Sequence, residues 1–85
     1  MKTFDYVVKD ELGIHARPAG LLVKEVKNYK SKVLLKKDDT EIDATRLMAI
    51  MALGVKCGTK VTLTIEGEDE EEACQALQQF FEEQL

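Results

Sequence analysis

The sequence is poor in the residues that build metal centres and disulfide frameworks. Its 85 residues include one histidine, two cysteines and no tryptophan. Cys57 and Cys74 form neither a C-x-x-C pair nor a ligand cluster, and a single histidine does not complete a zinc site with them. We therefore predict no metal and no other cofactor, and we expect both cysteines to be free thiols in a reducing compartment.

Long apolar runs are also missing. No stretch approaches the roughly 18 apolar residues that a membrane-spanning helix needs, and the first residues lack the apolar core of a signal peptide. We therefore expect a cytoplasmic protein without direct membrane insertion.

Basic residues are absent after Lys60. Residues 1–60 contain all 12 lysines and arginines together with 8 of the 16 acidic residues, and residues 61–85 contain the other 8 acidic residues. Nucleic-acid binding requires an excess of Lys and Arg along one face, so this balance argues against a general nucleic-acid binder. It permits a local basic patch that meets an acidic partner.

What is present predicts one folded domain over residues 1–85, with 45% hydrophobic and 33% charged residues. Alternating apolar residues predict strands over 3–8, 33–35 and 61–65, and a hairpin returns over 40–43. Helical spacing predicts helices over 16–27 and 45–53 and a last one after Gly67 or Asp69. The order β-α-β-β-α-β-α predicts an α+β fold, a two-layer open-faced sandwich.

The acidic run from Glu66 to Glu72 has a simple structural explanation. Acidic residues in the first turn of a helix are stabilised by the partial positive charge of its free N–H groups. We prefer this explanation to a metal site or an interaction tail.

The only histidine, His15, lies in the run Gly13-Ile14-His15-Ala16-Arg17-Pro18-Ala19, at the predicted start of the first helix. Free backbone N–H groups at a helix start attract anions, and Arg17 adds a forked cationic donor. Imidazole is nucleophilic near neutral pH and takes up and releases phosphoryl groups. The pattern favours a phosphorylation site over the alternative of an ordinary surface histidine.

This run resembles the active-site signature of the HPr family, the histidine phosphocarriers of the bacterial phosphoenolpyruvate:sugar phosphotransferase system. The segments from Ala44 to Leu53 and from Glu66 to Ala73 are also similar to that family. The resemblance implies a four-stranded antiparallel sheet in the order 1-4-2-3, with three helices on one face. It also implies a monomeric phosphocarrier that is not itself an enzyme.

The resemblance further implies the roles of the site residues and the partners. Enzyme I would phosphorylate His15 on its Nδ1 atom, and His15 would pass the phosphoryl group to the A domains of sugar permeases. Arg17 and the backbone N–H groups of Ala16 and Arg17 would hold the phosphoryl group. The sequence does not identify the acceptor permease.

The predicted helix over 45–53 is apolar around most of its circumference, so some of its residues must be exposed or covered by a partner. Methionines at these positions are core residues in most proteins, and that alternative stays open here. The resemblance implies instead a partner-binding surface, formed by Gly20, Lys24, Lys27, Arg46, Leu47, Met48 and Met51.

Position 46 departs from the family. Many HPr proteins carry a serine there that an ATP-dependent kinase phosphorylates, whereas this chain has Arg46, which does not accept a phosphate. We therefore predict no regulation at this position, and we expect the neighbouring Thr45 to cap the helix, with a substitute phosphate acceptor as the alternative. Two other functions stay open: an HPr-like regulatory module that controls an enzyme or transcription factor, and a specialised paralogue that serves a different acceptor.

Overall fold

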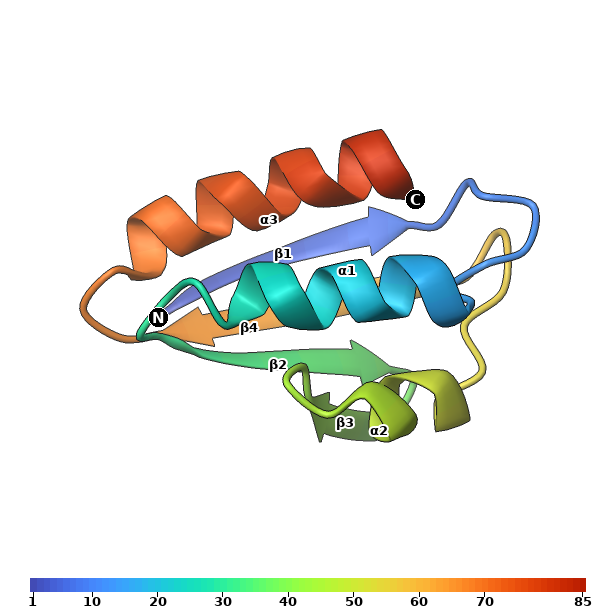
Figure 1. Ribbon diagram of the computed structural model, residues 1–85, viewed down its shortest axis with the longest axis horizontal. Coiled ribbons are helices and arrows are strands. Elements are labelled where there is room, and N and C mark those ends of the chain that lie inside the picture. Colours follow the sequence, from blue (N-terminus) through green and yellow to red (C-terminus); the bar gives the residue numbers. More distant parts are fainter.

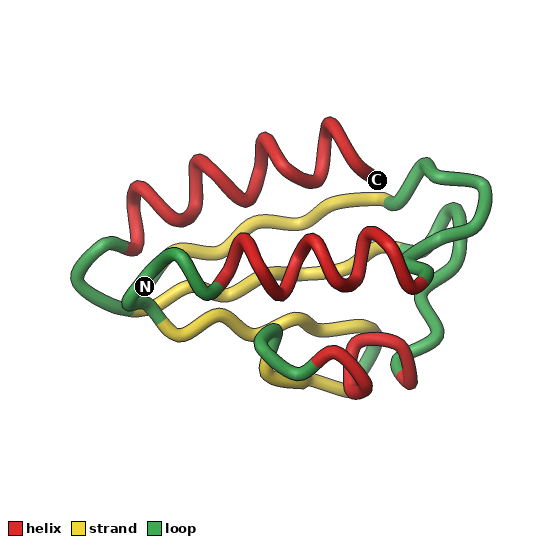
Figure 2. The backbone as a smooth tube through the Cα atoms, viewed as in Figure 1, coloured by secondary structure: helices red, strands yellow, loops and turns green.

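The computed structural model describes residues 1–85 and has the predicted order of elements. Its strands and helices are β1 (Lys2–Val7), α1 (Ala16–Val26), β2 (Lys32–Lys37), β3 (Thr40–Asp43), α2 (Leu47–Ala52), β4 (Lys60–Glu66) and α3 (Glu70–Gln84). The strands form one four-stranded antiparallel sheet in the order β1-β4-β2-β3. The three helices cover one face of this sheet: α3 packs along the edge strand β1 and its neighbour β4, α1 lies between α3 and α2, and α2 lies beside β3 (Figures 1 and 2). The predicted α+β sandwich is confirmed.

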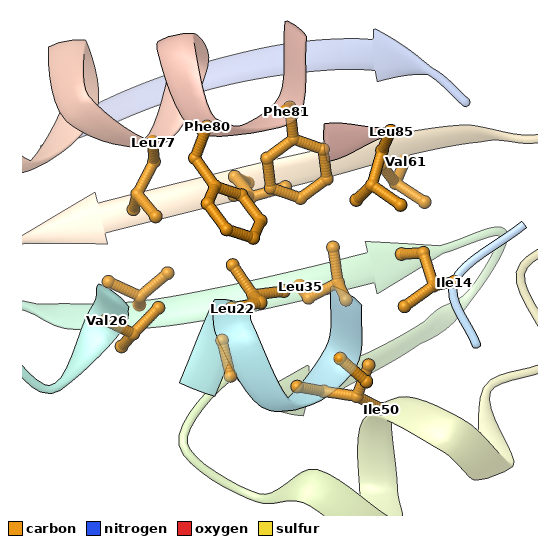
Figure 3. Packing of buried hydrophobic residues seen from close by; sticks show 14 of the residues in the cluster. Ile14, Leu22, Val26, Leu35, Ile50, Val61, Leu77, Phe80, Phe81 and Leu85 are labelled. Atoms are coloured by element: carbon orange, nitrogen blue, oxygen red, sulfur yellow. The ribbon is translucent and has the colours of Figure 1, made fainter. Parts of the chain in front are cut away.

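The core lies between the sheet and the helices. The central strand β4 directs Val61, Leu63 and Ile65 into it, and their alternation with threonines matches the period of a strand. Figure 3 shows side chains of α1 and α3 converging over the sheet. Phe81 is fully buried and makes edge-to-face contacts with the rings of Phe4 and Tyr6, at centroid distances of 6.0 and 5.5 Å. These contacts fix α3 against β1.

The helix α2 begins two residues later than expected, and the prediction that Thr45 caps it is wrong. The helix cap is Arg46, which makes no side-chain capping bond. Thr45 instead donates two hydrogen bonds to Asp43 Oδ1, from its backbone N–H at 2.9 Å and from its hydroxyl at 2.7 Å. These bonds lower the pKa of Asp43. The two hydrogen bonds to Asp43 form a local turn before the helix, and α2 starts after Arg46 rather than after Thr45.

At the start of α3, Glu70, Glu71 and Glu72 occupy the first turn, as predicted. The preceding Asp69 binds the loop between α1 and β2, because its carboxylate accepts hydrogen bonds from the N–H groups of Lys30 and Ser31 and from the Ser31 hydroxyl. These hydrogen bonds hold the pKa of Asp69 below its usual value. We call Asp69, Glu70 and the groups that they bind the acidic clamp.

Both cysteines are free thiols: Cys57 is exposed and Cys74 half-buried against the core. None of the helices combines the length and the apolar composition that crossing a membrane requires.

Candidate functional site

The loop between β1 and α1 is fixed by a contact with the segment that joins α2 to β4. Gly13 has a φ of +70°, and a Cβ atom at this position would lie 2.2 Å from the Val55 carbonyl oxygen. The next residue, Ile14, donates its N–H to the same oxygen at 3.0 Å and buries its side chain in the core. Only glycine combines this conformation with so close an approach. The contact therefore determines where α1 begins.

The other half of the loop is held by the end of α3. The N–H groups of Lys9 and Asp10 donate to the Leu85 carbonyl oxygen at 2.6 and 2.8 Å, and the Leu85 side chain is buried. Asp10 also closes the turn that follows: its carbonyl oxygen accepts from Gly13 N–H, and its Oδ1 accepts from Leu12 N–H, both at 2.9 Å. The backbone that leads to His15 is thus anchored at both ends.

His15 itself is the residue immediately before α1, in an extended conformation with φ −98° and ψ −173°. Its side chain is 37% exposed and makes no capping bond to the helix. The Oδ1 atom of Asp10 lies 3.9 Å from His15 Nε2. The imidazole ring is therefore accessible, and its Nδ1 atom makes no hydrogen bond.

The start of α1 presents free cationic and N–H groups beside this ring. The N–H groups of Ala16 and Arg17 have no acceptor, Pro18 has no N–H, and the N–H of Ala19 donates to the His15 carbonyl at 3.0 Å. The guanidinium of Arg17 makes no hydrogen bond or ion pair and is exposed. His15, Arg17 and Pro18 line a shallow hollow of about 310 Å³ together with Asp10 and Gln84. The structure thus brings the predicted His15, Ala16 and Arg17 together.

The predicted partner-binding residues lie on two adjoining helices (Figure 1). In α2, Met48 is 75% exposed, Leu47 and Met51 are also exposed, and only Ile50 is buried. The core alternative therefore does not apply to these methionines. On α1, Lys24 is exposed and Gly20 is half-buried, and Lys27, directly after the helix, is also exposed. We call the exposed groups of both helices and of Arg46 the α1–α2 face: Leu21, Lys24, Lys27, Arg46, Leu47, Met48 and Met51.

Sequence reasoning missed three residues in and around the site. Leu21 is exposed on α1, four residues after Arg17 and three before Lys24, so helical spacing alone would have placed it on their side. Leu12 is an exposed apolar side chain in the loop before His15. The approach of Asp10 to His15 depends on the folded loop, and no local sequence pattern indicates it.

Comparison with known proteins agrees with this geometry. The family model described as the PTS HPr component phosphorylation site matches residues 2–83. The chain is 41% identical over 78 residues to the HPr-like protein Crh of Bacillus subtilis, covering 92% of each chain. It is 39% identical over 83 residues to the phosphocarrier protein HPr of Mycoplasma pneumoniae, covering 96% of this chain and 94% of the relative.

The fold is also similar to that of solved structures. A crystal structure of HPr from Thermoanaerobacter tengcongensis matches with a TM-score of 0.92 and 41% identity, covering 96% of this chain and 92% of that one. HPr of that organism has also been solved as a dimer.

Proposed function

This chain belongs to the HPr family, whose members are phosphocarrier proteins rather than enzymes, and on this premise we propose that it carries phosphoryl groups on His15 within the sugar phosphotransferase system. Phosphorylated enzyme I is the donor, and the A domains of sugar permeases are the acceptors. One observation carries the proposal: an accessible imidazole, two free N–H groups and an unpaired guanidinium meet at the start of α1.

The chemistry follows from these groups. The lone pair of His15 Nδ1 attacks the phosphorus, a nitrogen–phosphorus bond forms, and the bond to the donor breaks, with its electron pair staying on the donor. The N–H groups of Ala16 and Arg17 and the guanidinium of Arg17 face the added negative charge. The second transfer runs the same steps toward the permease domain. An open site with few donors holds the phosphoryl group loosely, and this favours its onward transfer.

The α1–α2 face suits the docking of acidic partners. It combines exposed apolar side chains with Lys24, Lys27 and Arg46, none of which makes an ion pair within the chain. Apolar contacts supply affinity and unpaired cations raise the rate of encounter. We propose that the protein docks as a monomer in the cytoplasm, where its donor and acceptors meet it.

Kinase regulation at position 46 is not part of this proposal, because Arg46 offers no hydroxyl group. Thr45 is a poor substitute acceptor. Its hydroxyl donates to the Asp43 carboxylate, which would repel a phosphate on the same oxygen.

The second candidate is an HPr-like regulatory module, and the similarity to Crh favours it. Such a module would bind an enzyme or transcription factor and would not need to carry phosphate to sugars. The presence of His15 and Arg17 and the lack of a serine at position 46 count against it.

The test is the intact mass of the protein after incubation with phosphoenolpyruvate and enzyme I. We expect a mass increase of one phosphoryl group that disappears in acid, because phosphohistidine is acid-labile and phosphoserine is not. Addition of a permease A domain should discharge the labelled protein. A protein that stays unlabelled refutes the carrier function. Labelling without discharge by any A domain points to a specialised paralogue.

A further inference from the structure

We propose that Asp10 is a positioning residue for His15, whose carboxylate holds the Nε2 side of the imidazole ring so that Nδ1 is left free for the phosphoryl group. The inference rests on the proposed function in taking His15 as the phosphoryl acceptor. It adds a group that lies outside the Gly13 to Ala19 run and selects between the two ring nitrogens.

Hydrogen bonds of the Asp10 backbone and side chain hold its carboxylate in place. The N–H of Asp10 is bound to Leu85, its carbonyl accepts from Gly13, and its Oδ1 accepts from Leu12 N–H. The last bond fixes the oxygen that lies 3.9 Å from His15 Nε2. The carboxylate thus needs little further ordering to act on the ring, and this lowers the entropic cost of the interaction.

No other charged group competes for this carboxylate. Arg17 lines the same hollow, but no ion pair joins it to Asp10, and Lys9 next in sequence makes none either. The distance of 3.9 Å exceeds that of a direct hydrogen bond, so the interaction is an electrostatic attraction or passes through one bridging water. Since the Asp10 side chain is 32% exposed, solvent screens the attraction and its effect is modest.

A carboxylate at this position decides where the ring carries its hydrogen. Neutral imidazole has one N–H, and the group facing a nitrogen determines whether the hydrogen resides there. Asp10 favours the hydrogen on Nε2, which leaves the lone pair on Nδ1. After Nδ1 accepts the phosphoryl group, the ring is positively charged with its N–H still on Nε2, facing Asp10. No proton has to leave the ring during transfer.

The test compares Asp10→Asn with Glu11→Gln in the full-length protein. Asparagine keeps an oxygen for Leu12 N–H and removes the charge, whereas Glu11→Gln removes the same charge from an exposed residue of the same loop that forms no ion pair with His15. The ratio of the two neutral ring forms is read from ¹⁵N chemical shifts of the imidazole at alkaline pH. We expect Asp10→Asn to lower the ratio of Nε2–H to Nδ1–H about threefold, in line with a weak, solvent-screened attraction between the carboxylate and the ring N–H. Glu11→Gln should leave it unchanged, and Asp10→Glu should restore part of it.

An unchanged ratio in Asp10→Asn, or an equal change in Glu11→Gln, overturns the inference. Transfer kinetics with enzyme I give a second reading: Asp10→Asn should lower kcat severalfold with KM unchanged, because the docking surface is intact. Equal kcat in wild type and Asp10→Asn also counts against a positioning role. If the wild-type protein accepts no phosphoryl group, the proposed function fails, and the ring ratio, which needs no partner protein, still decides whether Asp10 orients His15.

Discussion

Around the start of α3, most charged groups are bound to partners within the chain, whereas the basic groups along α1 and α2 are left free. In the acidic clamp, Asp69 accepts three hydrogen bonds, and Glu70 binds the N-terminal amine at 2.7 Å and the Gly67 N–H at 3.2 Å. Around His15 and on the α1–α2 face, Arg17, Lys24 and Arg46 have no such partner. Charged groups of this chain thus fall into two classes, those bound within the fold and those free at the surface.

Charges that are bound within the chain serve the stability of the fold, whereas free charges serve binding to other proteins. A charge that is bound in the folded state stabilises that state and has little left to offer another protein. An exposed charge without a partner adds little to stability but attracts a partner of opposite charge. We therefore expect substitutions in the acidic clamp to change stability but not phosphoryl transfer, and substitutions at the site and on the α1–α2 face to do the reverse.

The largest expected effect is that of His15→Ala. It should abolish phosphoenolpyruvate-dependent labelling, because no other residue can accept the group as phosphohistidine. The melting temperature should stay close to that of the wild type, since the ring makes no hydrogen bond and is partly exposed. Intact mass and thermal unfolding check both statements. Continued labelling of this variant would place the acceptor elsewhere.

Met48→Asp should weaken enzyme I binding by about 30-fold or more, because a charge replaces the most exposed apolar group of the α1–α2 face and is desolvated only in the complex, at a cost of roughly 2 kcal/mol. Its stability should barely change, since Met48 is 75% exposed. The control is Gln78→Asp, which makes the same charge change at an exposed position of α3. Calorimetric titration measures the affinities. A large fall in melting temperature with unchanged affinity would contradict the assignment of Met48 to the docking surface.

Arg17→Ala should slow transfer about tenfold in at least one direction, because the phosphoryl group loses one charged donor. Labelling should still go to completion, since the nucleophile remains. Arg17→Lys keeps the charge without the forked geometry and should recover part of the rate. Rapid-quench kinetics with both partners check this. Wild-type kinetics for Arg17→Ala in both directions would remove the arginine from the site.

Asp69→Asn tests the role of the acidic clamp. It should lower the melting temperature by several degrees and leave phosphoryl transfer unchanged, because an amide cannot accept all three hydrogen bonds of the carboxylate. Since folding lowers the pKa of Asp69, its contribution is present at neutral pH and is lost as the pH falls below about 4. The variant should therefore lose less stability than the wild type between pH 5 and pH 3. Glu68→Gln, in an exposed residue of the same loop, is the control. Thermal unfolding across this pH range measures the difference.

Most of the fold could be predicted from the periodicity of the sequence. The alternation of Val61, Leu63 and Ile65 and the helical spacing of Ala19, Leu22 and Val26 place these residues in the core, where the structure has them. The order of strands could not be predicted in this way, because pairing joins residues far apart in sequence. It came from the family resemblance. Thr45 shows the limit of local rules: its side chain and N–H bind Asp43 in a turn, and the helix starts one residue later, after Arg46.

In the candidate site too, some features could be predicted from the local sequence and others could not. His15, Arg17 and the free N–H groups follow from one short run, because a helix start and its neighbours are local features. The position of the loop between β1 and α1 depends on contacts with Val55 and Leu85, from distant parts of the chain. The approach of Asp10 to His15 therefore could not be predicted.

The smallest expected effect is that of Arg46→Glu. This variant tests directly whether free charges of the α1–α2 face and bound charges of the acidic clamp differ in function. Reversing this charge should lower the rate of association with enzyme I severalfold at low salt, and the difference should shrink as ionic strength rises and screens the charges. The control is Lys30→Glu, which makes the same change of net charge within the acidic clamp, where Lys30 Nζ lies 3.8 Å from Glu68 Oε2. Stopped-flow association at several salt concentrations measures both variants. If only total charge matters, the two rates will fall equally. If free and bound charges differ as argued, Arg46→Glu will slow association and Lys30→Glu will leave it nearly unchanged, because only Arg46 belongs to the α1–α2 face.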